Sequence, residues 1–191
     1  MPLVGGLSLF GFGEGLLVAA HWGATPWTVF AQGVAQHLGI SLGWATALVS
    51  VVVLLAWWPL RERPGLGTLA NLVIIAVVLE LTATHVATPP SAWVRVILMI
   101  SGVLAIGLGS ALYLTTGLGP GPRDGLMTSL HRHLHVSVVY VRLSIELTVL
   151  AAGWLLGGVV GVGTAFFAAT IGFSVGGSLQ LVSHLVARWQ P

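Results

Sequence analysis

The stretch GLGPGPRDGLMTSLHRHLH, residues 117–135, contains the densest set of chemically capable groups in the chain. Its glycines, among them Gly119 and Gly121, allow the backbone to approach a ligand closely. The free amides that open the following helix favour an anionic group, and Arg123 adds a forked donor for a carboxylate or phosphate. Asp124 can stabilise the helix start, pair with an arginine, or bind a proton or cation. The structural alternative is a capped turn whose charges serve topology alone.

A second turn, GATPWTVFAQG at residues 23–33, repeats this backbone pattern without its charges. Trp27 and Thr28 stand where the other turn has Arg123 and Asp124. The two turns are therefore alike in backbone and unlike in chemistry. We predict a substrate-binding set drawn from both turns: Gly119, Gly121, Arg123, Asp124, Trp27 and Thr28.

Three glutamates fall inside apolar stretches, where a carboxylate costs several kcal/mol unless it is paired, protonated or facing water. Glu14 lies among small residues in GFGEG, and Glu80 has no partner nearby in the sequence. We predict that both serve proton or ion coupling. Glu146 follows Arg142 by four residues, so a local ion pair is expected there. Glu62, in the loop Arg-Glu-Arg, is expected to be a solvated charge.

The histidines His131, His133 and His135 suggest a metal site only weakly, because His131 and His135 alone would share a helix face. An amphipathic helix at the membrane interface is the preferred interpretation. The chain has no cysteine, which excludes disulfides and thiol chemistry. No Ser/His/Asp cluster falls on facing segments, so we predict neither an enzyme nor a bound cofactor or metal.

The composition of the chain indicates what kind of elements position these residues. Of 191 residues, 56% are hydrophobic and 6% are charged, whereas a soluble domain has about a quarter charged residues. Lipid must therefore be the main solvent, and the net charge of +2 excludes a nucleic-acid-binding surface. We predict an all-α polytopic membrane protein with six spans: about Leu3–Ala20, Leu42–Trp58, Gly67–Ala87, Val94–Thr116, Val138–Leu156 and Gly163–Ala187.

Two further helical stretches, 26–38 and 122–135, are too short to span, since each reaches only about 20 Å at 1.5 Å per residue. Each begins with a cap residue followed by proline, at Thr25–Pro26 and at Gly121–Pro122. These features are typical of short interfacial or re-entrant helices.

The sequence also matches itself at an offset of 96 residues, at glycines, prolines and tryptophans more than at aliphatic residues. Examples are Gly23 with Gly119, Pro26 with Pro122, Trp58 with Trp154, and Thr68 with Thr164. We predict one membrane domain, 1–191, made of a first repeat 1–92 and a second repeat 93–191. Because each repeat would hold three spans, an odd number, the two must be inverted in the membrane. The alternative is that two apolar halves merely look alike.

All seven basic residues are arginines, and a six-span topology places Arg95 alone on one side of the membrane. Arg61, Arg63, Arg123, Arg132 and Arg188 then share the side of the two termini, which the positive-inside rule makes cytoplasmic. Tryptophans near the span ends are expected to form an aromatic belt: Trp22, Trp57, Trp58, Trp93 and Trp189.

With the turns GLGPGPRDGLM and GATPWTVFAQG and the following HLGISLGW, the chain resembles the YczE-like integral membrane proteins, a bacterial group related to the YitT family. The matching positions are Gly119, Pro122, Arg123, Asp124 and Gly125 in one turn and Pro26, Trp27 and Gly33 in the other. The resemblance implies a multi-pass protein of the bacterial inner membrane and no particular substrate. Thr28 stands where some relatives have an acid, so a mechanism with two acids is not implied.

These observations favour a small secondary transporter or facilitator for a small anionic or zwitterionic molecule, bound where the two repeats meet. The alternative is a non-transporting membrane accessory that binds lipid or stabilises a partner, with spans packed through small residues. The expected partners are the lipid bilayer and a small solute, with no nucleic acid. A homodimer is compatible with either function.

Overall fold

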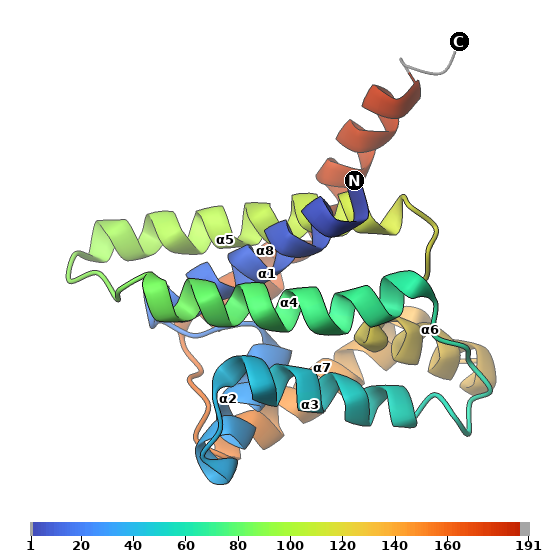
Figure 1. Ribbon diagram of the computed structural model, residues 1–191, viewed down its shortest axis with the longest axis horizontal. Coiled ribbons are helices and arrows are strands. Elements are labelled where there is room, and N and C mark those ends of the chain that lie inside the picture. The colour runs from blue at the N-terminus through green and yellow to red at the C-terminus, as the bar shows by residue number, and fades with distance from the viewer. Residues whose placement is uncertain (1, 188–191) are drawn as a thin grey trace.

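Residues 2–187, which the computed structural model describes, form eight α-helices and no strand (Figure 1). The helices are α1 (Pro2–Ala20), α2 (Pro26–Leu38), α3 (Leu42–Leu55), α4 (Leu66–His85), α5 (Ala92–Leu114), α6 (Pro122–Leu134), α7 (Val138–Leu155) and α8 (Val162–Ala187). The predicted all-α fold is confirmed, and both short helices begin at the predicted prolines. Arg188 and Trp189, used above for topology and for the aromatic belt, lie outside the described residues.

Within the described residues, α1, α4, α5, α7 and α8 are long and apolar enough to cross a membrane. A sixth crossing requires α2 and α3 together, and these two helices meet at a bend of 110°. The predicted span Leu42–Trp58 is therefore wrong in its extent, because α3 ends at Leu55 and its 14 residues reach only about 21 Å. Beyond Leu55 the chain turns, and Trp57 points inward to donate its indole N–H to the Pro122 carbonyl oxygen at 3.0 Å.

Helices α1 and α5 pack backbone against backbone at the core of the molecule. A Cβ atom added to Gly13 would lie 2.5 Å from the carbonyl oxygen of Gly102, and one added to Gly109 would lie 2.6 Å from that of Gly6. The end of each helix meets the start of the other, so the two run antiparallel. Small residues permit this approach. Helix α4 covers α1 and helix α8 covers α5.

The short helices α2 and α6 lie at opposite ends of the molecule (Figure 1). Each ends on a residue in the left-handed conformation, Gly39 with φ 64° and His135 with φ 55°. Such a residue closes a helix and redirects the chain, here into α3 and α7.

Positive φ angles recur at a fixed spacing in the described part of the chain. Its eight such residues form four pairs, each 96 residues apart: His21 with Gly117, Gly23 with Gly119, Gly39 with His135, and Arg61 with Gly157. Three of the eight are not glycine, and a positive φ is uncommon for such residues. The sharp turns of the first half thus recur in the second half.

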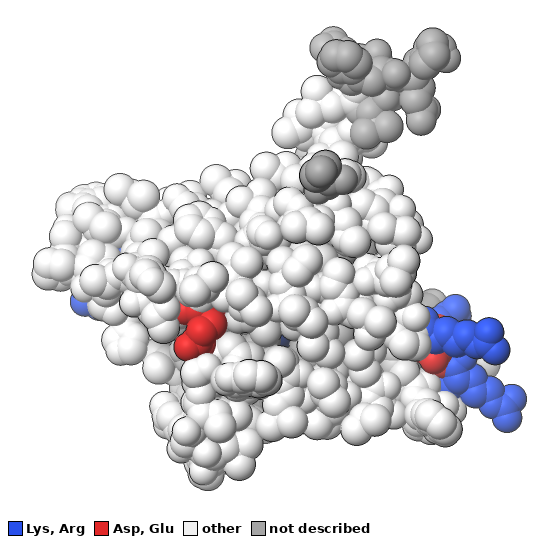
Figure 2. All heavy atoms as spheres, viewed as in Figure 1, with Lys and Arg blue, Asp and Glu red and all other residues white. Residues whose placement is uncertain are grey.

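Charged residues are scarce on the surface, and the basic ones lie mainly at one end. Figure 2 shows basic atoms gathered where Figure 1 places α6 and the loop between α3 and α4, with a small basic group at the opposite end. Trp58 and Trp93 are 85% and 80% exposed, as an aromatic belt requires. Trp57 is only 2% exposed, so its predicted place in that belt is wrong.

Candidate functional site

A cavity of about 190 Å³ at the centre of the protein is lined by residues from all eight helices. The amino ends of α2 and α6 both open onto it, through Thr25 to Trp27 and through Gly121, Arg123 and Asp124. Thr25 caps α2, because its hydroxyl oxygen accepts a hydrogen bond from the Thr28 N–H at 3.2 Å. The two turns, far apart in sequence, therefore contribute to one site.

The central feature of the cavity is an ion pair between Glu14 of α1 and Arg123 of α6, with Nη1 of Arg123 3.1 Å from Oε1 of Glu14. The Glu14 side chain is 1% exposed and the Arg123 side chain 18% exposed. Thr25 donates its hydroxyl to the same Glu14 oxygen at 3.2 Å. The Arg123 guanidinium also lies over the Trp27 ring, 5.2 Å from its centroid. One charge thus comes from each half of the chain.

Three buried polar atoms have no hydrogen-bond partner among the described residues, and all three belong to residues that line this cavity. They are Oε2 of Glu14, Nε1 of Trp27 and Oγ1 of Thr46. An unsatisfied buried polar group costs about 1–3 kcal/mol, so native proteins rarely leave one without a ligand or water. An acceptor, a donor and a hydroxyl on the residues that line this cavity are thus available to a water molecule or a ligand.

Asp124 lies at the rim of the cavity and is itself exposed. Its Oδ2 accepts a hydrogen bond from the buried hydroxyl of Tyr113 at 2.5 Å. Tyr113 lies near the end of α5, so this contact ties the first turn of α6 to the central helix pair. Asp124 does not contact Arg123 through an ion pair, which was one of the predicted alternatives.

Arg142 and Glu146 form the expected ion pair on α7, with Nε of Arg142 2.9 Å from Oε1 of Glu146. The pair is local in sequence, as predicted, but both residues also line the central cavity, which was not predicted. The 96-residue offset could have indicated that the pair lines the cavity. At that offset, Arg142 and Glu146 correspond to Thr46 and Ser50 of α3. All four residues line the same cavity.

Glu80, predicted to share a coupling role with Glu14, does not line this cavity. Its carboxylate Oε2 accepts a hydrogen bond from the Gly43 N–H at 2.6 Å, in the first turn of α3. A carboxylate at a helix amino end offsets the partial positive charge of the free amides. Glu80 therefore has the partner that the sequence did not reveal, and that partner is backbone.

Two members of the predicted substrate-binding set also lie outside the cavity lining. Gly119, with φ 114°, packs against Gly65 and Thr68 at the start of α4. Thr28 is fully buried and its hydroxyl lies 2.9 Å from that of Thr25, within hydrogen-bond distance. Both positions support the turns. The other four, Gly121, Arg123, Asp124 and Trp27, line the cavity.

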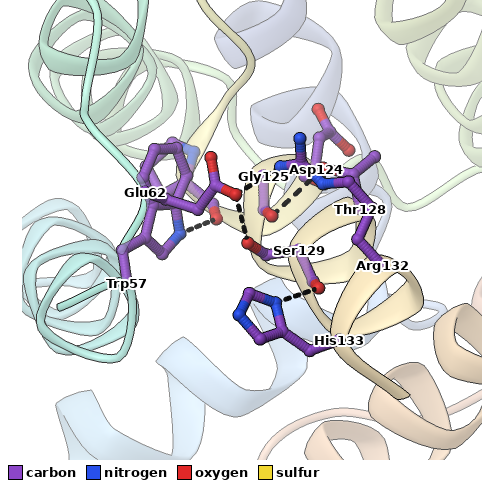
Figure 3. Close-up of polar contacts among 9 residues, drawn as sticks. Trp57, Glu62, Asp124, Gly125, Thr128, Ser129, Arg132 and His133 are labelled. Atoms are coloured by element: carbon purple, nitrogen blue, oxygen red, sulfur yellow. Dashed lines mark hydrogen bonds and ion pairs between the residues drawn. The ribbon is translucent and has the colours of Figure 1, made fainter. Parts of the chain in front are cut away.

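A second polar cluster joins the loop between α3 and α4 to helix α6 (Figure 3). Glu62 accepts a hydrogen bond from the Ser129 hydroxyl at 2.7 Å and pairs with Arg132. These contacts lower the pKa of the Glu62 carboxyl, the Ser129 hydrogen bond contributing most. Glu62 is therefore a partly exposed charge, and its two partners on α6, which were not predicted, fasten the loop to the short helix.

Comparisons with known proteins give a family but no activity. Residues 1–178 match the family described as "Family of unknown function (DUF6198)". An uncharacterized protein of Haemophilus influenzae is 46% identical over 179 residues, which cover 94% of this chain and 82% of the relative. The uncharacterized membrane protein YczE of Bacillus subtilis is 33% identical over 189 residues, covering 96% and 88% respectively. The YczE-like resemblance is therefore confirmed. No solved structure matches the chain.

Proposed function

We propose that this chain, which belongs to the DUF6198 family of unknown function, is a small secondary transporter or facilitator of the bacterial inner membrane. In this proposal two inverted repeats, 1–92 and 93–191, meet at the central cavity, which binds a small anionic or zwitterionic molecule. Both termini face the cytoplasm, on the side of Arg61, Arg63 and Arg132. Two findings already support a membrane protein. The fold has several helices that are long and apolar enough to cross a membrane, and the relative YczE is named as a membrane protein.

The four pairs of positive φ angles support the repeat, because unrelated halves have no reason to turn at equivalent positions. Loop contacts agree with them. The Gly67 N–H donates to the Leu118 carbonyl at 2.8 Å, and the equivalent Gly163 N–H donates to the Trp22 carbonyl at 2.7 Å. The antiparallel packing of α1 against α5 supports inversion. A two-fold axis that exchanges antiparallel spans must lie in the membrane plane.

The observation that carries the proposal is the composition of the cavity wall. Much of the lining consists of residue pairs 96 apart: Phe10 with Ile106, Glu14 with Ser110, Thr25 with Gly121, Trp27 with Arg123, Thr46 with Arg142, Ser50 with Glu146, Asn71 with Phe167, and Ile75 with Ile171. A space lined by equivalent residues from both halves lies on the axis between them. Transporters with inverted repeats bind their substrates at such a place.

The chemistry of the wall supports a polar solute. Glu14 and Arg123 neutralise each other, yet the second carboxylate oxygen of Glu14 and the indole N–H of Trp27 are left for a ligand. A zwitterion meets both needs, because its ammonium donates to Glu14 and its acidic group accepts from Trp27. In this proposal Glu14 also carries the coupling proton, since its protonation releases Arg123.

Binding is tested by thermal unfolding of the purified protein against amino acids, small carboxylates and small phosphorylated solutes. We expect at least one of these solutes to raise the unfolding temperature of the native protein. Arg123→Ala should lose that rise, whereas Arg61→Ala, at an exposed loop position, should keep it. An equal response of the two variants would show that Arg123 does not bind the solute.

Transport is tested with the stabilising solute in proteoliposomes under an imposed pH gradient. The native protein should accumulate the solute, and Glu14→Gln should abolish the dependence on the gradient because it removes the carboxyl group that carries the proton in this proposal. If no solute of the panel stabilises the protein or enters the vesicles, the chain is better described as a non-transporting accessory.

A further inference from the structure

A second hollow lies beside the central cavity, as an apolar groove of about 460 Å³ between α3 and α7. Its walls are almost entirely aliphatic or aromatic, with Ser144 and Thr148 as the polar exceptions. Like the cavity, the groove is lined by residues from both halves, such as Val49 with Ile145 and Val53 with Val149, each pair 96 positions apart.

The groove and the central cavity are neighbours between the same two helices. On α3, Thr46 and Ser50 line the cavity while Val49 and Val53 line the groove. On α7, the same division separates Arg142 and Glu146 from Ile145 and Val149. Positions three apart lie on adjoining parts of a helix surface, so the polar cavity and the apolar groove adjoin along both helices.

Trp27 is the partition between the two spaces, since it lines both of them. Its ring packs in an apolar cluster with Val49, Val53 and Met127, and it is 6% exposed. Its buried Nε1 has no partner among the described residues, and the Arg123 guanidinium lies over its ring. Trp27 thus borders both spaces and carries a polar atom as well as an apolar ring.

Size also links the two spaces. The cavity alone, at about 190 Å³, is below the roughly 300–1,000 Å³ of most small-molecule sites. Cavity and groove together fall within that range. A ligand that uses the whole cleft has a polar end and an apolar end.

We propose that cavity and groove form one site for an amphiphile with a single apolar chain and a zwitterionic head. The chain lies in the groove and the head lies in the cavity. This inference rests on the proposed function, because it names the substrate class of the same site. It also suggests the route of entry: the groove-lining side chains of Leu48 and Val52 are exposed and aliphatic, as suits contact with lipid, so in this proposal the ligand enters sideways from the bilayer.

The charges of the cavity select the head. Its lining holds two guanidinium groups, Arg123 and Arg142, and three carboxyl groups, Glu14, Asp124 and Glu146, so a purely anionic head is disfavoured. An ammonium with N–H groups satisfies Oε2 of Glu14, and a phosphate oxygen satisfies Nε1 of Trp27. A quaternary ammonium has no N–H to donate and should bind less well.

The test uses the full chain in nanodiscs of phosphatidylcholine, with radiolabelled lysophosphatidylethanolamine carrying a twelve-carbon chain as the probe. We expect saturable binding that competes with unlabelled probe. The twelve-carbon lysophosphatidylcholine should compete at least about tenfold less well, a difference of roughly 1.4 kcal/mol. Glycerophosphoethanolamine, which has the head without the chain, should also compete at least about tenfold less well.

A matched pair of variants tests the groove. Val52→Trp fills it from an exposed position of α3, whereas Val51→Trp adds the same bulk at the next exposed position, which does not line it. Val52→Trp should raise the Kd of the probe about tenfold or more and leave the inhibition constant of glycerophosphoethanolamine unchanged. Val51→Trp should leave both the Kd and the inhibition constant unchanged.

The outcomes separate this inference from the proposed function. If glycerophosphoethanolamine competes as well as the probe, or if the two tryptophan variants behave alike, the groove holds no chain and the amphiphile is refuted while a polar solute site stands. If the probe shows no saturable binding but the solute screen finds a ligand, the amphiphile is likewise refuted. If neither assay finds a ligand, both proposals fail together.

Discussion

Arg123 and Trp27 hold equivalent positions 96 residues apart, and their side chains meet, with the guanidinium carbon 5.2 Å from the centroid of the indole ring. In the proposed inverted repeat, two equivalent residues touch only where they approach the axis between the halves. The contact therefore joins the amino ends of α2 and α6 at the place where the central cavity is lined from both sides. Predictions about binding, stability and topology follow from this arrangement.

The indole N–H of Trp27 should matter for binding and little for folding. Trp27→Phe keeps an aromatic ring under Arg123 and removes a buried donor that has no protein partner in the described part of the chain. The weaker cation–π contact costs about 0.5–1 kcal/mol and the lost unsatisfied group offsets it. We expect a nearly unchanged unfolding temperature and a smaller ligand-induced rise, both measured by thermal unfolding. A large loss of stability without ligand would contradict this.

The ion pair between Glu14 and Arg123 should show strong coupling in a double-mutant cycle. Glu14→Gln leaves a largely buried guanidinium unpaired, and Arg123→Gln leaves a buried carboxylate unpaired. Breaking a buried pair in this way costs about 3–5 kcal/mol. The double variant Glu14→Gln/Arg123→Gln has no unpaired charge and should be more stable than either single variant. Reversible denaturant unfolding of all four proteins measures the coupling, and additive losses would rule out the pair.

Stability should fall in acid through Glu62. Its pKa is lower in the folded protein than in the unfolded chain, chiefly because of the Ser129 hydrogen bond. The contribution is therefore complete above the ordinary value near 4.5 and is lost as pH falls through the lowered folded value. We expect the difference in unfolding temperature between native protein and Glu62→Gln to shrink over that acidic range. Ser129→Ala should reduce the same pH dependence, and an unchanged gap would contradict the assignment.

The close approach of α1 and α5 should make Gly109→Ala destabilising. The added Cβ would lie 2.6 Å from the Gly6 carbonyl oxygen, and a helix backbone cannot give way as a side chain can. Overpacking of this kind costs about 1–3 kcal/mol. Gly172→Ala is the control, because nothing lies within 4 Å of a Cβ there and alanine favours helix. In thermal unfolding, Gly109→Ala should lower the unfolding temperature and Gly172→Ala should raise it slightly.

Topology can be mapped with single cysteines, since the sequence contains none. A cysteine at Ser91, in the loop between α4 and α5, should react with a membrane-impermeant thiol reagent added outside intact cells. A cysteine at Arg63 should react only after the membrane is opened. Labelling of Ser91→Cys from the cytoplasmic side alone would overturn the proposed orientation.

The sequence was sufficient to locate the helices, because apolar length, proline and cap residues are local properties. Both short helices begin at Pro26 and Pro122 as expected. It was also sufficient to single out Glu14, Arg123 and Trp27, since a charge inside an apolar stretch and the residues of a repeated turn both stand out in this chain. It could not say which of them would meet.

The sequence could not predict a side chain's contact when its partner lies on backbone or on a helix that is distant in the chain. Glu80 lacks a side-chain partner in sequence, and its actual partner is the Gly43 N–H, which becomes available only because α3 begins there. Trp57 reads as a membrane-belt residue until α6 brings the Pro122 carbonyl within reach. The orientation of Arg142 and Glu146 into the cavity depends on how α7 is rotated, which its apolar surroundings do not determine.

The division of charge in the Glu14–Arg123 pair makes the two halves of the chain complementary. An assembly of two copies of the first half would place Glu14 near tryptophan and leave two acids uncompensated, and two copies of the second half would leave two bases opposite serine. Neither half can therefore substitute for the other. In the proposed repeat, one chain that holds both halves supplies one Glu14 for each Arg123, and either half alone lacks the partner of its charge.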